Sequence, residues 1–264
     1  MSNKYAIVLE TKDFEKSQNE VDAVLDLVRN GVYAFVQFVV APDTYKNLQA
    51  IVKEKFCGVK AVIHAPFFIS GLNLSDPDLL NSNLQKLSDA QKFADNLKSD
   101  VIVLHPGIGN DEKLLYENIR QMKMLNDSRI AVENLPYKPC HGHKTLGSTP
   151  EQIKKIMDEV GCNFCFDVAH AICAINSLKL DADSTLTKFN ALKPIIYHLS
   201  DGDNDAEVDY HFHLGKGNYD LQKIFGLFSD SRIVLETRRK EGDLEACTAD
   251  VQFARNLENG EIHD

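Results

Sequence analysis

Eight short apolar runs, rich in β-branched residues, constrain the fold of this chain more than any other feature. The chain has 264 residues, so one run recurs about every 33 residues, the length of a strand, a helix and their turns. Apolar runs without polar alternation are typical of strands buried on both faces of a parallel sheet. The runs are Tyr5–Glu10, Ala34–Val40, Lys60–Phe67, Val101–Gly107, Arg129–Pro136, Cys162–His170, Pro194–Asp201 and Ser231–Arg238.

The segments between these runs carry the periodicity of amphipathic helices. Glu20–Arg29 places its valine and leucine residues on one face, and Ser82–Lys98 repeats this spacing. Thr149 and Pro150 are typical of an N-cap and a first helical residue, and this helix is expected to reach Val160. The chain therefore alternates strands with helices along its length.

Eight alternating units, with no linker or compositional break between them, predict one α/β domain. We expect a single (β/α)8 TIM barrel over residues 1–264. The alternative is an open, doubly wound parallel sheet. That architecture does not require eight evenly spaced strands, and no glycine-rich phosphate loop follows the first run. The regular spacing favours the barrel.

Composition excludes several classes of protein. No apolar stretch approaches the roughly 18 residues that a membrane span needs, so we expect no membrane partner. The N-terminal residues lack the pattern of a secretory signal, and six cysteines without framework spacing suggest reduced thiols in the cytoplasm. A formal net charge of −10 argues against a broad basic face that coats nucleic acid.

Potential metal ligands gather where the predicted strands end, which is where a barrel of this kind carries its chemistry. Singly, each could be a satisfied core histidine or a strand cap, but buried ionisable groups are costly unless paired or metal-bound. Together they favour a metal site, and mixed imidazole and carboxylate ligands suit zinc, manganese or iron. The residues are His64, His105, Glu133, Asp167, His170, His198 and Glu236, with Asp209 and His211 in the loop after the seventh run.

On these motifs the chain resembles the xylose isomerase-like barrel superfamily, and in particular the endonuclease IV type of apurinic/apyrimidinic endonuclease. The spacings Asp-x-x-His, Asp-x-His-x-x-x-Gly and Glu-Asn all occur together. The resemblance runs from about the third predicted strand to the eighth. Its matching segments are residues 63–78, 101–107, 132–153, 163–171, 197–221 and 234–237.

The resemblance implies a cluster of up to three divalent ions, with Zn²⁺ expected and Mn²⁺ possible as the metal. The first ion would be held by His64, His105 and a bridging Glu133. The second would be held by Glu133, Asp167, His198 and Glu236. The third would be held by His170, Asp209 and His211.

The activity implied by this resemblance is hydrolysis of a phosphoester, with cleavage of abasic DNA as the named case. Glu133, Asp167 and Glu236 would be the catalytic residues. A multinuclear site of this kind activates a bridging water at neutral pH and stabilises a phosphate leaving oxygen.

The alternative is a sugar or sugar-phosphate isomerase or epimerase, an activity found in the same superfamily. It would use one ion, held by the second ligand set alone, and its substrate would be a small sugar or sugar phosphate. Glu133 and Glu236 would then move the α-proton as base and acid. His64, His105, His170 and His211 would bind substrate or support the structure.

The chain departs from the endonuclease pattern at three places. After the first ligand histidine it has Ala65-Pro66-Phe67, and its sixth strand reads Asp167-Val168-Ala169-His170. After the seventh strand it has Ser200-Asp201-Gly202-Asp203, within an acidic segment where the endonucleases have a lysine. The missing lysine removes an expected phosphate contact. These differences favour the small-sugar alternative, whereas the complete ligand set favours the hydrolase.

Several other residues leave alternatives open. His213 could replace His211 as a ligand, although the spacing to Gly215 favours His211. Arg238-Arg239-Lys240 could bind an anion or form a solvated turn, and Cys140–His143 could form a lid over the pocket. Cys162 and Cys165 are expected to be buried thiols on opposite faces of a strand. The sequence leaves the oligomeric state and the metal identity open.

Overall fold

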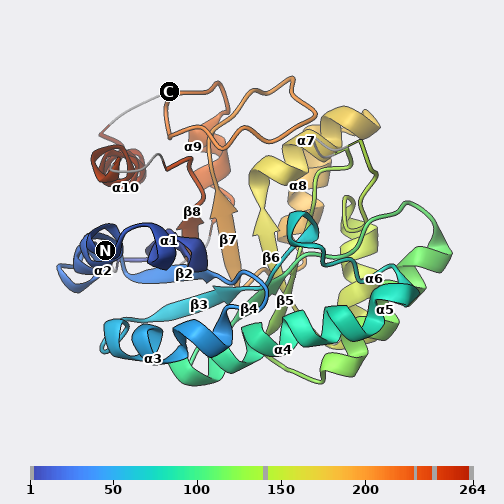
Figure 1. Ribbon diagram of the computed structural model, residues 1–264. Coiled ribbons are helices and arrows are strands. Elements are labelled where there is room, and N and C mark those ends of the chain that lie inside the picture. The colour runs from blue at the N-terminus through green and yellow to red at the C-terminus, as the bar shows by residue number, and fades with distance from the viewer. Residues whose placement is uncertain (1–2, 139–141, 229–230, 240–242, 262–264) are drawn as a thin grey trace.

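Eight parallel strands close into a barrel in sequence order, from β1 to β8 and back to β1 (Figure 1). The computed structural model describes residues 3–138, 142–228, 231–239 and 243–261. Each strand lies inside one of the eight predicted runs, so the predicted (β/α)8 barrel is confirmed. The strands are β1 (Tyr5–Glu10), β2 (Phe35–Val39), β3 (Ala61–His64), β4 (Ile102–Leu104), β5 (Ile130–Glu133), β6 (Asn163–Asp167), β7 (Ile196–Leu199) and β8 (Arg232–Leu235).

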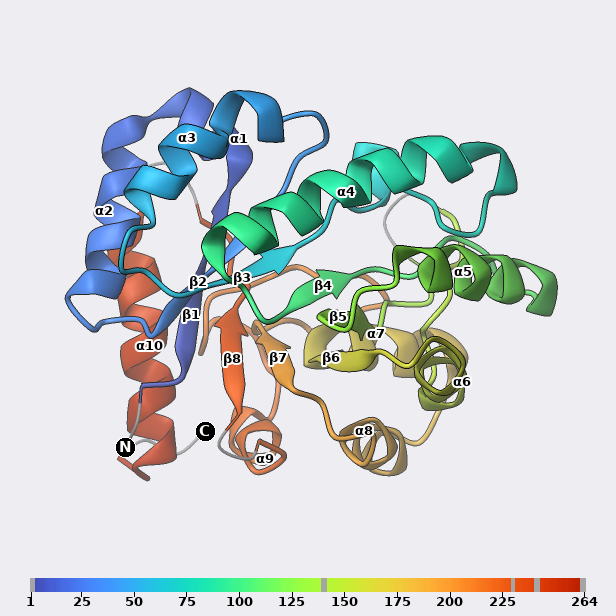
Figure 2. The same ribbon diagram turned by 90° about the horizontal axis from the view of Figure 1, so that it is seen from below.

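Helices surround the barrel, as Figure 2 shows with the strands at the centre. None of the described helices is both long and apolar enough to cross a membrane. The helices are α1 (Thr11–Lys16), α2 (Gln18–Arg29), α3 (Tyr45–Lys55), α4 (Leu80–Leu97), α5 (Glu112–Leu125), α6 (Pro150–Val160), α7 (Val168–Leu178), α8 (Ala182–Asn190), α9 (Leu221–Phe225) and α10 (Leu244–Glu258), with 3-10 turns η1 (Phe68–Ser70) and η2 (Pro77–Leu79).

Local capping sets the helix ends that the sequence predicts. The side chain of Thr149 accepts a hydrogen bond from the backbone N–H of Gln152, so α6 begins at Pro150 as expected. Gly161 ends α6 in the left-handed conformation, with φ of 74°. The predicted helices that correspond to α2 and α4 are also present, each beginning two residues before the predicted start.

The sixth run differs from the expectation, because it is not a strand through His170. β6 ends at Asp167, and Val168 begins α7. The physical reason is a cap: the Asp167 carboxylate accepts a hydrogen bond from the backbone N–H of His170 at 2.7 Å. His170 therefore reaches the barrel mouth from the first turn of a helix.

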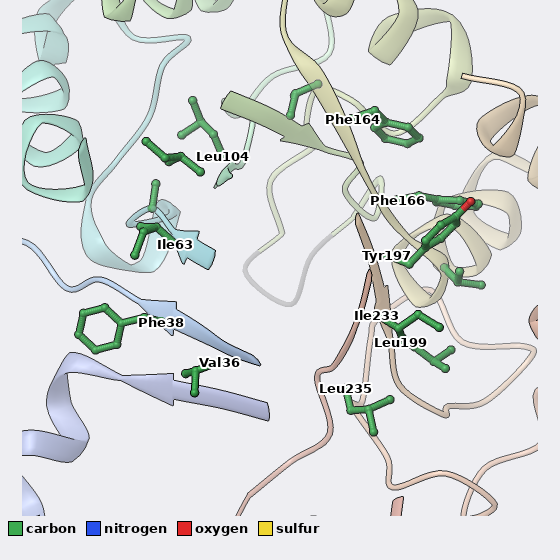
Figure 3. Packing of buried hydrophobic residues seen from close by; sticks show 14 of the residues in the cluster. Val36, Phe38, Ile63, Leu104, Phe164, Phe166, Tyr197, Leu199, Ile233 and Leu235 are labelled. Carbon is green, nitrogen blue, oxygen red and sulfur yellow. The ribbon is translucent and has the colours of Figure 1, made fainter. Parts of the chain in front are cut away.

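Alternating side chains divide each strand between two environments. One set packs outward against the helices in the main core, and Figure 3 labels several of its members, including Phe38, Phe166 and Tyr197. The other set points into the barrel and forms a small apolar layer. This inner layer contains Ala6, Phe35, Val62, Val101, Val103, Ala131, Cys165, Ile196 and Val234. The residue two positions beyond an inner residue points inward as well, so the strand ends deliver side chains to one central point.

The outer core can be tested at Phe38, which is fully buried and lies edge-on to Phe56 and Phe93 at ring-centroid distances of 5.3 Å. We expect Phe38→Ala to lower the free energy of unfolding by about 3–5 kcal/mol in urea denaturation. Ile69, which is 70% exposed, is the control. Ile69→Ala should change the free energy by less than about 0.5 kcal/mol. Equal losses in the two variants would contradict this description of the core.

Candidate metal centre

The nine predicted ligand residues meet at the carboxyl ends of the strands. His64, Glu133 and Asp167 are the last residues of β3, β5 and β6. His105 and Glu236 directly follow β4 and β8, and His198 lies inside β7. Each of these six strand-end residues lies two positions beyond an inner-layer residue, which directs its side chain into the barrel. The other three, His170, Asp209 and His211, come from α7 and the loop after β7.

The potential ligand atoms form three groups that match the three predicted sets. Within each group these atoms lie within 4.8 Å of one another. The groups are His64, His105 and Glu133; Glu133, Asp167, His198 and Glu236; and His170, Asp209 and His211. A further group of Glu133, Cys165 and His198 meets the same criterion.

Glu133 lies at the centre of this arrangement. Its Oε2 is 3.3 Å from His64 Nε2 and 3.1 Å from His105 Nε2. Its Oε1 is 3.2 Å from His170 Nδ1 and 3.4 Å from His198 Nδ1. Although these atoms are close, neither carboxylate oxygen makes a hydrogen bond within the described residues, and both are buried. A buried carboxylate of this kind needs compensating positive charge, which protonated imidazoles or a bound cation can supply, so the geometry is compatible with metal binding.

Hydrogen bonds to backbone carbonyls orient three of the imidazoles. The Nδ1–H groups of His64, His170 and His211 donate to the carbonyl oxygens of Ala65, Asn134 and Glu236 at 2.7, 3.0 and 2.8 Å. Because Nδ1 is engaged by a carbonyl oxygen, Nε2 is the nitrogen left to bind a metal in each ring. Metal-ligating histidines are fixed by second hydrogen bonds of this kind.

Asn134 is a supporting residue that our sequence reasoning named only as part of the Glu-Asn motif. Its side chain donates to the Asp167 carbonyl at 2.7 Å and accepts from the Asp167 N–H at 2.8 Å. It therefore ties the end of β5 to the end of β6. Gln37 was missed entirely. Its position could have indicated a role, because Gln37 is a single amide inside the apolar run that contains β2.

The structure separates the roles of His211 and His213. His213 donates through Nδ1 to Asp250 Oδ2 at 2.7 Å, and Asp250 also accepts from the Leu214 N–H at 2.9 Å. His213 thus anchors the loop to α10. His211 instead joins His170 and Asp209, whose Oδ2 is buried without a hydrogen bond in the described part of the chain.

Four carboxylates in one buried site dominate its electrostatics. Burial raises the pKa of Asp167 to about 7, an effect that the His170 imidazole partly offsets. Burial disfavours the charged form of His170, but Asp167, Glu133 and Asp209 together raise its pKa to about 10. The surplus of negative charge attracts a cation, and the buried histidine and carboxylate groups are compatible with metal binding.

A cavity of about 770 Å³ opens above the centre. Its lining includes apolar residues such as Phe67, Phe68 and Pro136, and charged residues such as Arg238 and Arg239. This volume is in the range of pockets that hold small molecules.

The two arginines of the predicted anion-binding segment have different surroundings. Arg239 is paired with Asp13 at 2.6 Å and with Glu20 at 3.4 Å, whereas Arg238 is exposed and lines the cavity. Of the Arg238-Arg239-Lys240 segment, only Arg238 is therefore placed to meet an anion; Lys240 lies outside the described residues.

Asp201, in the acidic segment after β7, is buried and structural. Its carboxylate accepts backbone hydrogen bonds from Gly202, Gly217 and Tyr219. The segment's other acids are Asp203, Asp205 and Glu207, and the latter two are exposed.

The cysteines follow the expectation where they are described. Cys162 belongs to the outer core and Cys165 to the inner layer, so these two buried thiols lie on opposite faces of the sheet. Cys140 and His141, from the predicted lid, lie outside the described residues.

The fold and the site define the class: a (β/α)8 barrel with a histidine and carboxylate cluster at the carboxyl ends of its strands. Residues 25–257 match the family model described as "Xylose isomerase-like TIM barrel". The chain belongs to this family.

Proteins similar to this chain carry different names. The chain is 30% identical over 174 residues to "Probable endonuclease 4" of Staphylococcus epidermidis, an alignment that covers 60% of this chain and 57% of the relative. It thus spans less than two thirds of that relative's length. Two solved structures, endonuclease IV from Thermus thermophilus and a D-tagatose 3-epimerase-like protein, each align with a TM-score of 0.69. The endonuclease IV is 19% identical, and its alignment covers 97% of this chain and 99% of that chain. The epimerase-like protein is 20% identical, and its alignment covers 98% of this chain and 100% of that chain. These two likenesses show the fold alone.

Replacing the two neighbouring histidines tests their separate roles. We expect His211→Ala to lose one bound ion per chain in elemental analysis of the metal-replete protein, because it removes a ligand of the third group. His213→Ala should keep every ion but lower the free energy of unfolding by about 1–3 kcal/mol, because Asp250 loses a partner. Loss of an ion from His213→Ala alone would reverse the assignment.

Proposed function

We propose that the chain is a metal-dependent phosphoester hydrolase that cleaves DNA at abasic sites, as endonuclease IV enzymes do. The observation that carries the proposal is that three of the groups match the three implied ligand sets. A single-ion enzyme needs only the group around His198, so in such an enzyme His64, His105, His170 and His211 would hold no metal. The endonuclease 4 name of the curated relative supports the same choice.

In this proposal Glu133 joins two metal positions. Its Oε2 faces His64 and His105, and its Oε1 faces His198. Glu133 would therefore belong to two of the groups that would hold divalent ions, His64 and His105 completing one and His198 belonging to the other. Divalent ions there, expected to be Zn²⁺, supply Lewis acidity that activates water at neutral pH and stabilises charge on a leaving phosphate oxygen.

The remaining residues would bind and orient the substrate. His170, Asp209 and His211 would hold a third ion beside the scissile phosphate. Arg238 is exposed on the cavity wall two residues beyond Glu236, where a guanidinium can contact a phosphate. Phe67 and Phe68, which also line the cavity, would offer apolar surface to a sugar or base.

One observation favours a second candidate, a sugar or sugar-phosphate isomerase or epimerase. The loop after β7 carries Asp203, Asp205 and Glu207 where the endonucleases have a lysine, and these acids repel a phosphate backbone. The group of Glu133, Asp167, His198 and Glu236 would suffice for this chemistry with one ion. Glu133 and Glu236 would then exchange the proton next to the sugar carbonyl.

Cleavage of a duplex with one abasic site tests the proposal. With Zn²⁺ or Mn²⁺ present, the chain should cut the strand next to that site, and a chelator should stop the reaction. Glu133→Gln should reduce the rate at least about 100-fold, because one carboxylate serves two metal positions. Glu159→Gln, at an exposed ion pair with Lys123, is the matched control and should cut normally.

The contradicting result is equally specific. A metal-replete chain that leaves abasic DNA intact, yet exchanges the α-hydrogen of a ketose with solvent deuterium, would support the isomerase and overturn the hydrolase.

A further inference from the structure

We propose that Gln37 is a positioning residue that fixes the ring of His198 so that Nδ1 faces the centre, and that orients Glu236 beside it. The inference rests on the proposed metal centre and deepens it. β2 contributes no member of the three ligand groups, so Gln37 would add this strand to the centre.

Gln37 is a buried amide in an apolar setting. It is fully buried, and its neighbours in the sheet register are Val8 on β1 and Val62 on β3. Along β2 it lies two residues beyond Phe35, a member of the inner layer, so its side chain points into the barrel. A buried amide is costly unless both of its ends are hydrogen-bonded.

Both ends of the amide are engaged by predicted ligands. Gln37 Oε1 lies 2.8 Å from His198 Nε2, and Gln37 Nε2 lies 2.5 Å from Glu236 Oε1. An ionised carboxylate only accepts hydrogen bonds, so the NH₂ end of Gln37 faces Glu236. The oxygen end then faces His198, and His198 Nε2 carries the proton that it donates.

These hydrogen bonds fix which nitrogen of His198 faces the centre. Nε2 is engaged by Gln37, whereas Nδ1 makes no hydrogen bond within the described residues. Nδ1 lies 3.2 Å from Glu236 Oε1 and 3.4 Å from Glu133 Oε1. A ring nitrogen held between two carboxylates in this way is placed where a metal ion would bind.

Removing the amide would release both side chains. Without Gln37, the His198 Nε2–H has lost its acceptor and Glu236 Oε1 has lost a donor. The His198 ring and the Glu236 carboxylate could then turn away from the centre, which would weaken a metal ion held between them. Gln37 therefore acts through His198 and Glu236, and we do not assign it contact with substrate.

The test compares Gln37→Met with Gln121→Met. Methionine matches glutamine in length but cannot orient either ligand. Gln121 is an equally buried amide, bonded to Asn83, Glu117 and the Asp76 carbonyl, and it belongs to none of the three ligand groups. Its replacement controls for the loss of a buried hydrogen-bond network.

The two measurements are the affinity for Zn²⁺ and the ¹⁵N shifts of the His198 ring. In Zn²⁺ titrations against a competing chelator, Gln37→Met should weaken one ion by about 10–100-fold and leave the others unchanged. In the Zn²⁺-loaded protein, ¹⁵N shifts of the His198 ring should show a metal-bound Nδ1 and a protonated Nε2, and at the same Zn²⁺ concentration Gln37→Met should lose the metal-bound signal. Gln121→Met should change neither measurement.

The outcomes separate this inference from the proposed function. Suppose that the wild-type chain binds three ions and cleaves abasic DNA. If Gln37→Met then has the same Zn²⁺ affinities and the same ¹⁵N shifts of the His198 ring, only the role of Gln37 is overturned. A wild-type chain that binds no ion overturns both. If Gln37→Met and Gln121→Met weaken Zn²⁺ equally, the effect is general destabilisation and the positioning role is wrong.

Discussion

The buried carboxylate of Glu133 is the constraint on which the rest of the site depends. It is fully buried, and four imidazoles approach its oxygens without making a hydrogen bond in the described part of the chain. Such a group is costly in a protein interior unless positive charge compensates it. The barrel provides the means, since eight parallel strands direct their last inward-facing residues to one point.

The layers of the barrel hold the buried Glu133 carboxylate and the side chains around it in place. Below the ligands, the inner layer from Ala6 to Val234 excludes water, and the outer core packs the strands against the helices. Above them, hydrogen bonds from His64, His170 and His211 to carbonyl oxygens fix the direction of each ring. Rigid strands therefore supply most of the ligands, and the loop after β7 supplies Asp209 and His211.

Much of this arrangement could be predicted from the sequence, because its causes are local. The eight apolar runs predict the strands, and a polar residue at the end of most runs predicts the site. What escaped prediction depends on contacts between distant residues or on a local cap. His170 lies on a helix because Asp167 caps that helix. His213 is hydrogen-bonded to Asp250 on α10, which is distant in the sequence. Gln37 on β2 contacts His198 on β7 and Glu236 after β8.

The central claim is that one carboxylate joins several metal positions. Anomalous diffraction at the zinc absorption edge, from crystals grown with Zn²⁺ and no chelator, tests it most directly. The account predicts three peaks, each within one of the three ligand groups, with Glu133 in contact with two of them. A single peak, bounded by Glu133, Asp167, His198 and Glu236, would contradict it.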